Sequence, residues 1–414
     1  MPPPSRTSLP LDVVHTIATL AECADLSSLV LASRRLNELL TPVLYSTIDL
    51  GAWDNIAMCL RTLKTPLEQC IYGRNLAGFV RLFRIRTPPT RLPFYVSTSA
   101  LAEDIHCALS RMGNLRRVSS DLYLGVKAPE ILYTLVSGSS PLLRAIEFYT
   151  CDECPPLLQG ELVLTVPSQL RSFKLNLPAH LPTAQAALLR NLLTECSPTL
   201  STLSLIMDRR AERDFWASVL PQRTTFSSLQ ALEIDGNALS HPSLAQAVQL
   251  HSLNIIHSWE RPPASLHDLL PNVKELSCPR QLLRDFLYKT PELRRRPIDT
   301  VHIDNIFSEP CDVQRMRPLP ARKEPPSGRD LIASFELLQY SSLAVKSLSF
   351  EINLITGVAL KTIRHYLRDL EYMAISIRYK FYYEKVGVVS APWSSAEITK
   401  RDFVRIFFVC SLRI

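Results

Sequence analysis

The feature that most constrains the fold is a short apolar phrase, L-x-x-L-x-L, that recurs along most of the chain. Its clearest copies begin at Leu143, Leu170, Leu200 and Leu229, so the steps between them are 27, 30 and 29 residues. Steps of this size lie within or just above the length of a leucine-rich repeat. Because the last two apolar positions alternate with other residues, the phrase predicts a strand with one buried face. Further copies begin at Ile298, Val345 and Leu370, and weaker ones lie at 80–85, 115–124, around Leu253 and at 273–276.

The segments between these copies are predicted to return as helices. The best example is 182–196, whose leucines share one helical face, and 330–340 and 356–369 have a similar pattern. One strand and one helix cannot bury an apolar face alone, whereas stacked repeats share a continuous core. The sequence therefore predicts an α/β solenoid with parallel strands on its concave face and helices on its convex face. The alternative is a mixed α/β domain in which the leucine spacing is a coincidence.

The residue just after a repeat strand adds detail to this prediction, because an Asn or Cys there can satisfy backbone groups in the turn. The segment LQALEIDGNAL has Asn237 at this position, and Cys151 and Asn353 occupy the same offset in two other repeats. Asp208 and Pro178 stand there elsewhere. We therefore expect an irregular solenoid.

The first fifty residues follow a different pattern, which predicts three short helices. Apolar residues recur at helical spacing from Val13 to Leu20. Asp25 is the predicted N-cap of a second helix. A third helix is predicted over 34–40 and should be stopped by Pro42, with a strand following at 44–50. Such a small unit buries little surface by itself, so we expect it to need a partner or a following domain.

This segment resembles an F-box, the helical module by which substrate receptors dock on the adaptor subunit of cullin–RING ubiquitin ligases. The residues that carry the match are Leu9-Pro10, Asp12, Val13, Ile17, Leu20, Asp25-Leu26, Leu29 and Ser33-Arg34-Arg35-Leu36. The segment departs from the family at Ala32-Ser33, where Val-Cys is frequent, and at Leu36, where Trp is frequent. The resemblance implies that the adaptor-binding residues are Leu9, Pro10, Val13, Ile17, Leu26, Leu29 and Leu36. The alternative is a three-helix cap on a larger domain.

By this resemblance, the chain is expected to be the substrate-recognition subunit of an SCF-type cullin–RING E3 ubiquitin ligase, with the repeat domain binding a target protein. The alternative function is a leucine-rich-repeat interaction scaffold with no ligase role. On each repeat strand, the positions beside the last apolar residue point away from the core, which selects candidate substrate-binding residues. They are Glu147, Tyr149, Lys174, Asn176, Glu233, Asp235, His302, Asp304, Ser349 and Glu351.

These patterns divide the chain into four parts. We expect a disordered N-terminus at 1–8, an F-box-like module at 9–50, a solenoid at 51–395 with an insertion loop near 310–330, and a C-terminal cap or last strand at 396–414. No run of about eighteen apolar residues predicts a membrane span. The N-terminus lacks the apolar core of a signal peptide, and the ten cysteines form no disulfide framework. The expected location is therefore the cytoplasm, the nucleus or both.

Residues with catalytic or metal-binding chemistry are sparse. Cys151 and Cys154 form a lone C-x-x-C without the second pair that a zinc site needs. His251 and His257 flank a strand-like run and match no metal motif. The 11 glycines do not cluster as phosphate-binding loops require, and the net charge of +7 forms no basic stripe. We therefore expect no enzyme activity, cofactor, metal, nucleic acid or membrane. An activity tied to either the cysteine or the histidine pair would contradict this.

Overall fold

The structure is a computed structural model of the 414-residue chain, and it contains two compact units, Met1–Leu229 and Gln230–Ile414. The two units are described separately. The residues that the structure describes are 10–65, 75–87, 97–122, 128–148, 169–177, 181, 183–207, 213–222, 224–245, 247–256, 270–287, 295–304, 334–352, 363, 365–378 and 405–411.

The first unit begins with three short helices, as the sequence predicts. They are α1 (Leu11–Leu20), α2 (Cys23–Ala32) and α3 (Arg34–Leu44). Two predicted boundaries are wrong. The second helix begins at Cys23 after the N-cap Glu22, so Asp25 lies in the first turn, where its negative charge suits the helix dipole. The third helix continues through Pro42, because a proline near the last turn removes only one backbone hydrogen bond.

These helices enclose a small apolar core of their own. Its buried members are Ala18 of α1, Leu26 and Val30 of α2, and Leu40 of α3. At the start of α3, the Ser33 hydroxyl accepts a hydrogen bond from the backbone N–H of Leu36 at 3.2 Å. This N-cap fixes the turn between α2 and α3 and thereby the packing of the two helices.

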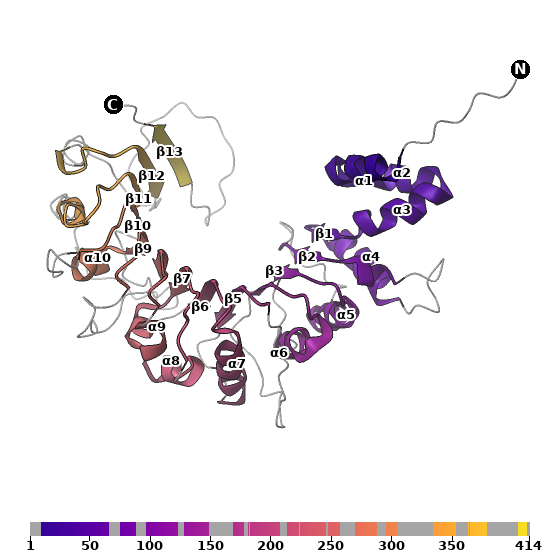
Figure 1. The fold of residues 1–414 in the computed structure, drawn as a ribbon, viewed down its shortest axis with the longest axis horizontal. Coiled ribbons are helices and arrows are strands. Elements are labelled where there is room, and N and C mark those ends of the chain that lie inside the picture. Colours follow the sequence, from indigo (N-terminus) through magenta and orange to yellow (C-terminus); the bar gives the residue numbers. More distant parts are fainter. Residues whose placement is uncertain are drawn as a thin grey trace, which may run out of the picture. The chain divides into compact units, whose positions relative to one another are not determined.

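Six parallel strands follow in the first unit, and neighbours in the chain are neighbours in the sheet. They are β1 (Thr47–Leu50), β2 (Leu82–Ile85), β3 (Arg117–Ser120), β4 (Ala145–Phe148), β5 (Ser172–Leu177) and β6 (Thr202–Met207). The connections contain α4 (Trp53–Lys64), η2 (Leu76–Phe79), α5 (Thr98–Leu109), α6 (Ala128–Thr134) with η4 (Leu135–Ser139), α7 (Thr183–Cys196) and, after β6, α8 (Arg213–Val219). Helices α4 to α7 lie on one side of these strands (Figure 1).

The second unit repeats this arrangement. Its strands are β7 (Ala231–Ile234), β8 (Ser252–Ile255), β9 (Glu275–Pro279), β10 (Thr300–Asp304), β11 (Ser347–Ile352), β12 (Tyr372–Arg378) and β13 (Arg405–Ser411). Among its described residues, the connections contain the helices η5 (Gly236–Ser240), α9 (Pro242–Ala245) and α10 (Arg280–Leu287). Strands β7 to β12 pair in parallel, whereas β13 pairs antiparallel with β12. The α/β architecture of N-terminal helices followed by parallel repeat strands is therefore confirmed.

The repeated apolar phrase forms the core because the strands pair in register. In the first unit, Phe83, Val118, Ile146, Phe173 and Leu203 are aligned across β2 to β6, and all five are buried. In the second unit, Leu232, Leu253, Leu276, Val301 and Leu348 form the equivalent buried row across β7 to β11. Each coil thus completes the core of the next one.

Several sequence predictions concern the connections. The helix predicted at 182–196 is confirmed as α7. For the predicted helices at 330–340 and 356–369, the structure describes helical residues at 334–338, 363 and 365–366. Cys151, Cys154, His257, Asn353 and the predicted loop near 310–330 lie outside the described residues. No described helix is long and apolar enough to cross a membrane.

Candidate protein-interaction surfaces

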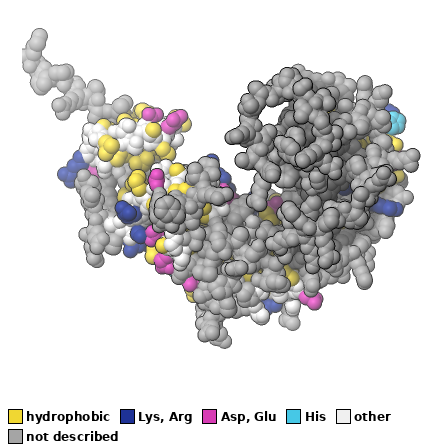
Figure 2. Space-filling model, turned by 180° about the vertical axis from the view of Figure 1, so that it is seen from behind, with side chains coloured by type: hydrophobic (Ala, Val, Ile, Leu, Met, Phe, Trp, Pro, Cys, Tyr) yellow, Lys and Arg dark blue, Asp and Glu magenta, His cyan; other side chains and the backbone are white. Residues whose placement is uncertain are grey.

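Helix α1 carries apolar side chains on two adjacent faces. Val14, Ala18 and Ala21 face the core of the three-helix module, which leaves Val13 and Ile17 on the next stripe. The exposed fractions of Val13, Ile17 and Leu20 are 38%, 49% and 83%, and that of Leu31 on α2 is 84%. Figure 2 shows hydrophobic side chains gathered on the surface of this module. We call Val13, Ile17, Leu20 and Leu31 the apolar surface of the module.

The structure separates the adaptor-binding residues implied by the resemblance into two groups. Leu26 is buried in the core of the module, and Leu29 and Leu36 pack against that core while remaining partly exposed. Pro10, Val13 and Ile17 are exposed, and Leu9 lies outside the described residues. Leu20 and Leu31 were absent from the predicted set although they are the most exposed of the leucines whose side chains the structure describes in the module.

The repeat strands of the first unit present a row of polar side chains on the face opposite the core. Strand pairing aligns Asp49, Arg84, Ser119, Glu147, Lys174 and Ser204 across β1 to β6. Two ion pairs lie beside this row. Arg117 Nη2 is 2.8 Å from Glu147 Oε1, and Arg86 pairs with Asp49. Glu147, Lys174 and Asn176 of the predicted substrate-binding set lie on this face and are half-buried.

The equivalent row of the second unit is formed by Glu233, Asn254, Ser277, His302 and Ser349. The Asn254 side-chain amide donates to Glu233 Oε1 at 2.7 Å, and His302 Nδ1 is hydrogen-bonded to Ser349 Oγ. These contacts join neighbouring coils through their side chains. The predicted residues His302 and Ser349 are therefore neighbours, whereas Glu233 lies on the same row three strands away, and each of the three is hydrogen-bonded to an adjacent coil.

Asp235 does not point outward as the strand alternation predicted. Its side chain is buried, and Oδ1 accepts a hydrogen bond from the backbone N–H of Asn237 at 2.8 Å. Asp235 is thus the N-cap of η5, which tightens the turn after β7. Asn237, predicted to satisfy the turn, is buried there as well. The side chains of Tyr149, Asp304 and Glu351 lie outside the described parts of the structure.

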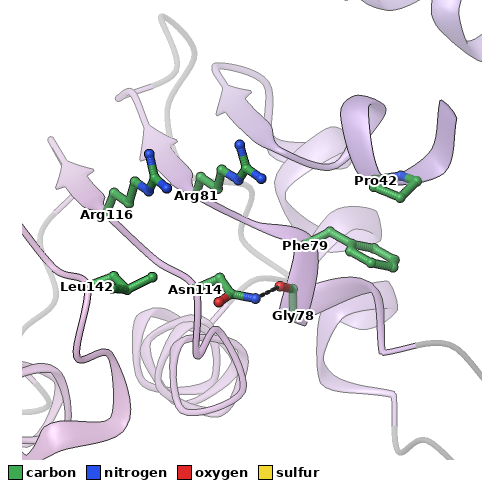
Figure 3. A pocket seen from close by; sticks show the side chains of 7 residues that line it. All are labelled: Pro42, Gly78, Phe79, Arg81, Asn114, Arg116 and Leu142. Atoms are coloured by element: carbon green, nitrogen blue, oxygen red, sulfur yellow. Dashed lines mark hydrogen bonds between the residues drawn. The ribbon is translucent and has the colours of Figure 1, made fainter. Parts of the chain in front are cut away.

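A small pocket opens in the first unit between η2 and the starts of β2 and β3. Its volume is about 160 Å³. The lining residues are Pro42, Gly78, Phe79, Arg81, Asn114, Arg116 and Leu142. Asn114 closes one side by donating a hydrogen bond from Nδ2 to the Gly78 carbonyl at 2.6 Å (Figure 3). No local sequence pattern indicates this pocket, because its lining residues come from four separate segments.

One group of potential metal ligands lies on helices α5 and α6. Ligand atoms of Glu103, His106 and Glu130 lie within 4.8 Å of one another, and no fourth ligand joins them among the described residues. His106 Nε2 is also 2.7 Å from Thr134 Oγ1. Since exposed acidic groups are common without a metal, this cluster does not define a metal site.

Burial suppresses the reactivity of several cysteines. It raises the pKa of Cys59 to about 11 and that of Cys196 to about 12, so both thiols stay protonated near neutral pH. Cys23, at the start of α2, is exposed. His251 is exposed and lies just before β8.

The surfaces described above are the basis for interpreting function, because sequence comparison with known proteins gives no match. No protein-family model matches the chain, and no curated protein matches it at a significant level.

Proposed function

We propose that the chain is the substrate-recognition subunit of an SCF-type cullin–RING E3 ubiquitin ligase. In this proposal the three N-terminal helices are an F-box that docks on the adaptor subunit. The parallel-strand units belong to an irregular leucine-rich-repeat solenoid, with strands on its concave face, and this solenoid binds the target protein. Such a subunit forms no covalent bonds itself. It raises the local concentration of the target and fixes its position near the ubiquitin-loaded enzyme.

The observation that carries this proposal is the apolar surface of the N-terminal module. The module already has a closed core built from Ala18, Leu26, Val30 and Leu40. Its additional exposed leucine, isoleucine and valine side chains therefore do not serve its own folding. A cluster of exposed apolar side chains on a small helical unit is typical of a protein-binding face. Val13 and Ile17 also match the F-box pattern.

The repeat strands support the second half of the proposal. The row of the first unit contains the charged residues Asp49, Arg84, Glu147 and Lys174 and two buried serines, and the row of the second unit is mostly neutral with Glu233 at one end. Mixed polar rows on a rigid sheet suit a polar segment of another protein, because they offer charge complementarity along the sheet.

Co-purification of the full chain with the adaptor subunit tests the proposal. The wild-type chain should recover the adaptor at one-to-one stoichiometry. The Ile17→Asp/Leu20→Asp variant should lose at least about 100-fold in affinity, because two charges would enter an apolar interface. The matched control is Val248→Asp/Leu343→Asp, which changes two exposed apolar residues of the second unit and should bind normally. Recovery of adaptor by the Ile17/Leu20 variant at the wild-type level would reject the docking surface.

The second candidate function is a repeat scaffold without a ligase role. Leu36 favours it, because this residue replaces the frequent F-box aromatic and packs against the module's own core. In that case the wild-type chain would recover no adaptor, while circular dichroism showed a folded protein.

A further inference from the structure

Four arginines that are distant in sequence occupy one position in four successive coils of the first unit. They are Arg81, Arg116, Arg144 and Arg171, each just before its strand, and all four are exposed. The backbone N–H of Arg116 donates to the Arg81 carbonyl at 2.7 Å, that of Arg144 to Arg116 at 2.7 Å, and that of Arg171 to Arg144 at 2.8 Å. We call this set the arginine ladder.

The ladder has defined ends. Before it, the carbonyl of Ser46 accepts from the backbone N–H of Arg81 at 2.9 Å, and after it the backbone N–H of Ser201 donates to Arg171 at 2.8 Å. Adjacent parallel strands are about 4.8 Å apart, so the four arginine backbones span roughly 14 Å. The sequence shows no basic stripe because consecutive arginines of the ladder are separated by whole repeats, and only strand stacking brings them together.

The four arginines are not neutralised within the described part of the chain. Arg117 and Arg86, by contrast, pair with Glu147 and Asp49. No ion pair to a described acidic side chain involves a ladder arginine. Figure 3 shows Arg81 and Arg116 side by side, with their guanidinium groups pointing the same way and away from Asn114 and Gly78. Both also line the pocket between η2 and the starts of β2 and β3. Stacked like charges repel each other, and a bound anionic group would relieve this repulsion.

We propose that the arginine ladder binds an extended acidic segment, rich in Asp or Glu, of a partner protein. An extended chain advances about 3.4 Å per residue, so four to five residues cover the ladder. Guanidinium groups bind carboxylates through paired hydrogen bonds, and the long arginine side chains reach carboxylates on alternate residues. The pocket beside Arg81 and Arg116 gives one end of the segment a recess. If the proposed ligase function holds, this segment is part of the target protein.

A protein segment fits this surface better than a nucleic acid does. A short ladder bounded by serines offers few phosphate contacts, whereas nucleic-acid affinity depends on many of them.

Fluorescence anisotropy with the full-length protein and labelled hexaglutamate tests this inference. The wild-type protein should bind hexaglutamate and not hexaglutamine, and the affinity should fall as NaCl rises from about 0.05 M to about 0.3 M. Arg116→Gln/Arg144→Gln removes the two central rungs and should weaken binding roughly tenfold, since each exposed ion pair contributes up to about fivefold. The charge-matched control is Arg35→Gln/Arg61→Gln, which changes exposed arginines of α3 and α4 and should bind as the wild type does.

A variant that reverses the charge of the two central arginines provides a second test with a larger expected effect. Arg116→Glu/Arg144→Glu should abolish hexaglutamate binding and create affinity for hexalysine. The inference is overturned if wild-type protein does not bind hexaglutamate, if both double Gln variants bind equally, or if hexathymidylate binds more tightly than the peptide. The adaptor is absent from this assay, so its outcome is independent of the docking of the N-terminal helices.

Discussion

The N-terminal helical module and the repeat strands of the first unit both bury apolar residues at regular spacing, but they differ in what remains exposed. Strands such as β4 and β5 contribute a buried row to the next coil and present charged side chains, Glu147 and Lys174, on the opposite face. The module closes its own core and still exposes Val13, Ile17, Leu20 and Leu31. The difference indicates that the repeats are completed by their neighbours, whereas the module presents an apolar surface suited to another protein.

The largest effect should come from placing a charge in the module core. Leu40→Asp puts a carboxylate among Ala18, Leu26 and Val30, where no solvent compensates it, and should cost at least about 4 kcal/mol. Limited proteolysis of the full chain should then cut within the first fifty residues and spare the repeats. Ile17→Asp is the paired control and should change stability by no more than about 0.5 kcal/mol. Equal protease resistance of both variants would contradict the assignment of inner and outer faces.

The rate of thiol labelling should differ by orders of magnitude between a cysteine of the N-terminal module and one of the repeats. Cys23 of the module is exposed, whereas Cys196 of α7 is buried with its pKa raised to about 12 by desolvation. The thiolate is the reactive form, so at pH 8 roughly one Cys196 thiol in ten thousand is ionised. Mass spectrometry after brief iodoacetamide treatment should find Cys23 modified and Cys196 intact. Raising the pH toward 12, which ionises the thiol, or adding urea, which unfolds the protein, should allow labelling of Cys196. Early labelling of Cys196 under native conditions would show that α7 does not pack as described.

The sequence predicted the repeat strands well because two signals agreed at each one. The L-x-x-L-x-L phrase marks both the strand and its buried face, and Phe173 and Leu203 are aligned across β5 and β6 as the phrase implies. Helix α7 was equally predictable from its leucine periodicity. Helix caps were harder to predict from the sequence than the repeat strands. Asp235 follows the outward alternation of β7, yet it turns inward because its carboxylate caps η5.

The interaction surfaces were less predictable, for two physical reasons. Apolar positions at helical spacing do not reveal from the sequence which of them face inward, so the predicted docking set included the buried Leu26 and omitted the exposed Leu20. The arginine ladder depends on strand register across whole repeats, and Arg81 and Arg116 become neighbours only after β2 and β3 pair. Both surfaces therefore become recognisable only in the tertiary structure.

Removing a buried side chain from a single repeat tests whether the coils depend on each other. Leu203 is fully buried on β6, in register with Phe173 of the neighbouring coil. Leu203→Ala should lower the free energy of unfolding by about 2–5 kcal/mol, because it leaves a cavity between coils. Ile206→Ala on the same strand is partly exposed and should cost less than about 1.5 kcal/mol. Urea denaturation measures both. A smaller loss for Leu203→Ala than for Ile206→Ala would invert the assignment of the two faces of β6.

The smallest effect should come from the outward face of the repeats. Arg117 and Glu147 form an ion pair of 2.8 Å between β3 and β4, and the exposed fraction of the Arg117 side chain is 53%. Water and salt screen such a pair, so Glu147→Gln should change the free energy of unfolding by at most about 1 kcal/mol.

The same substitution removes a negative charge beside the arginine ladder and releases Arg117. Hexaglutamate affinity should therefore rise about twofold at low salt, while Arg117→Gln/Glu147→Gln should return it to the wild-type value. A fall in affinity for Glu147→Gln would place the acidic segment elsewhere on the first unit.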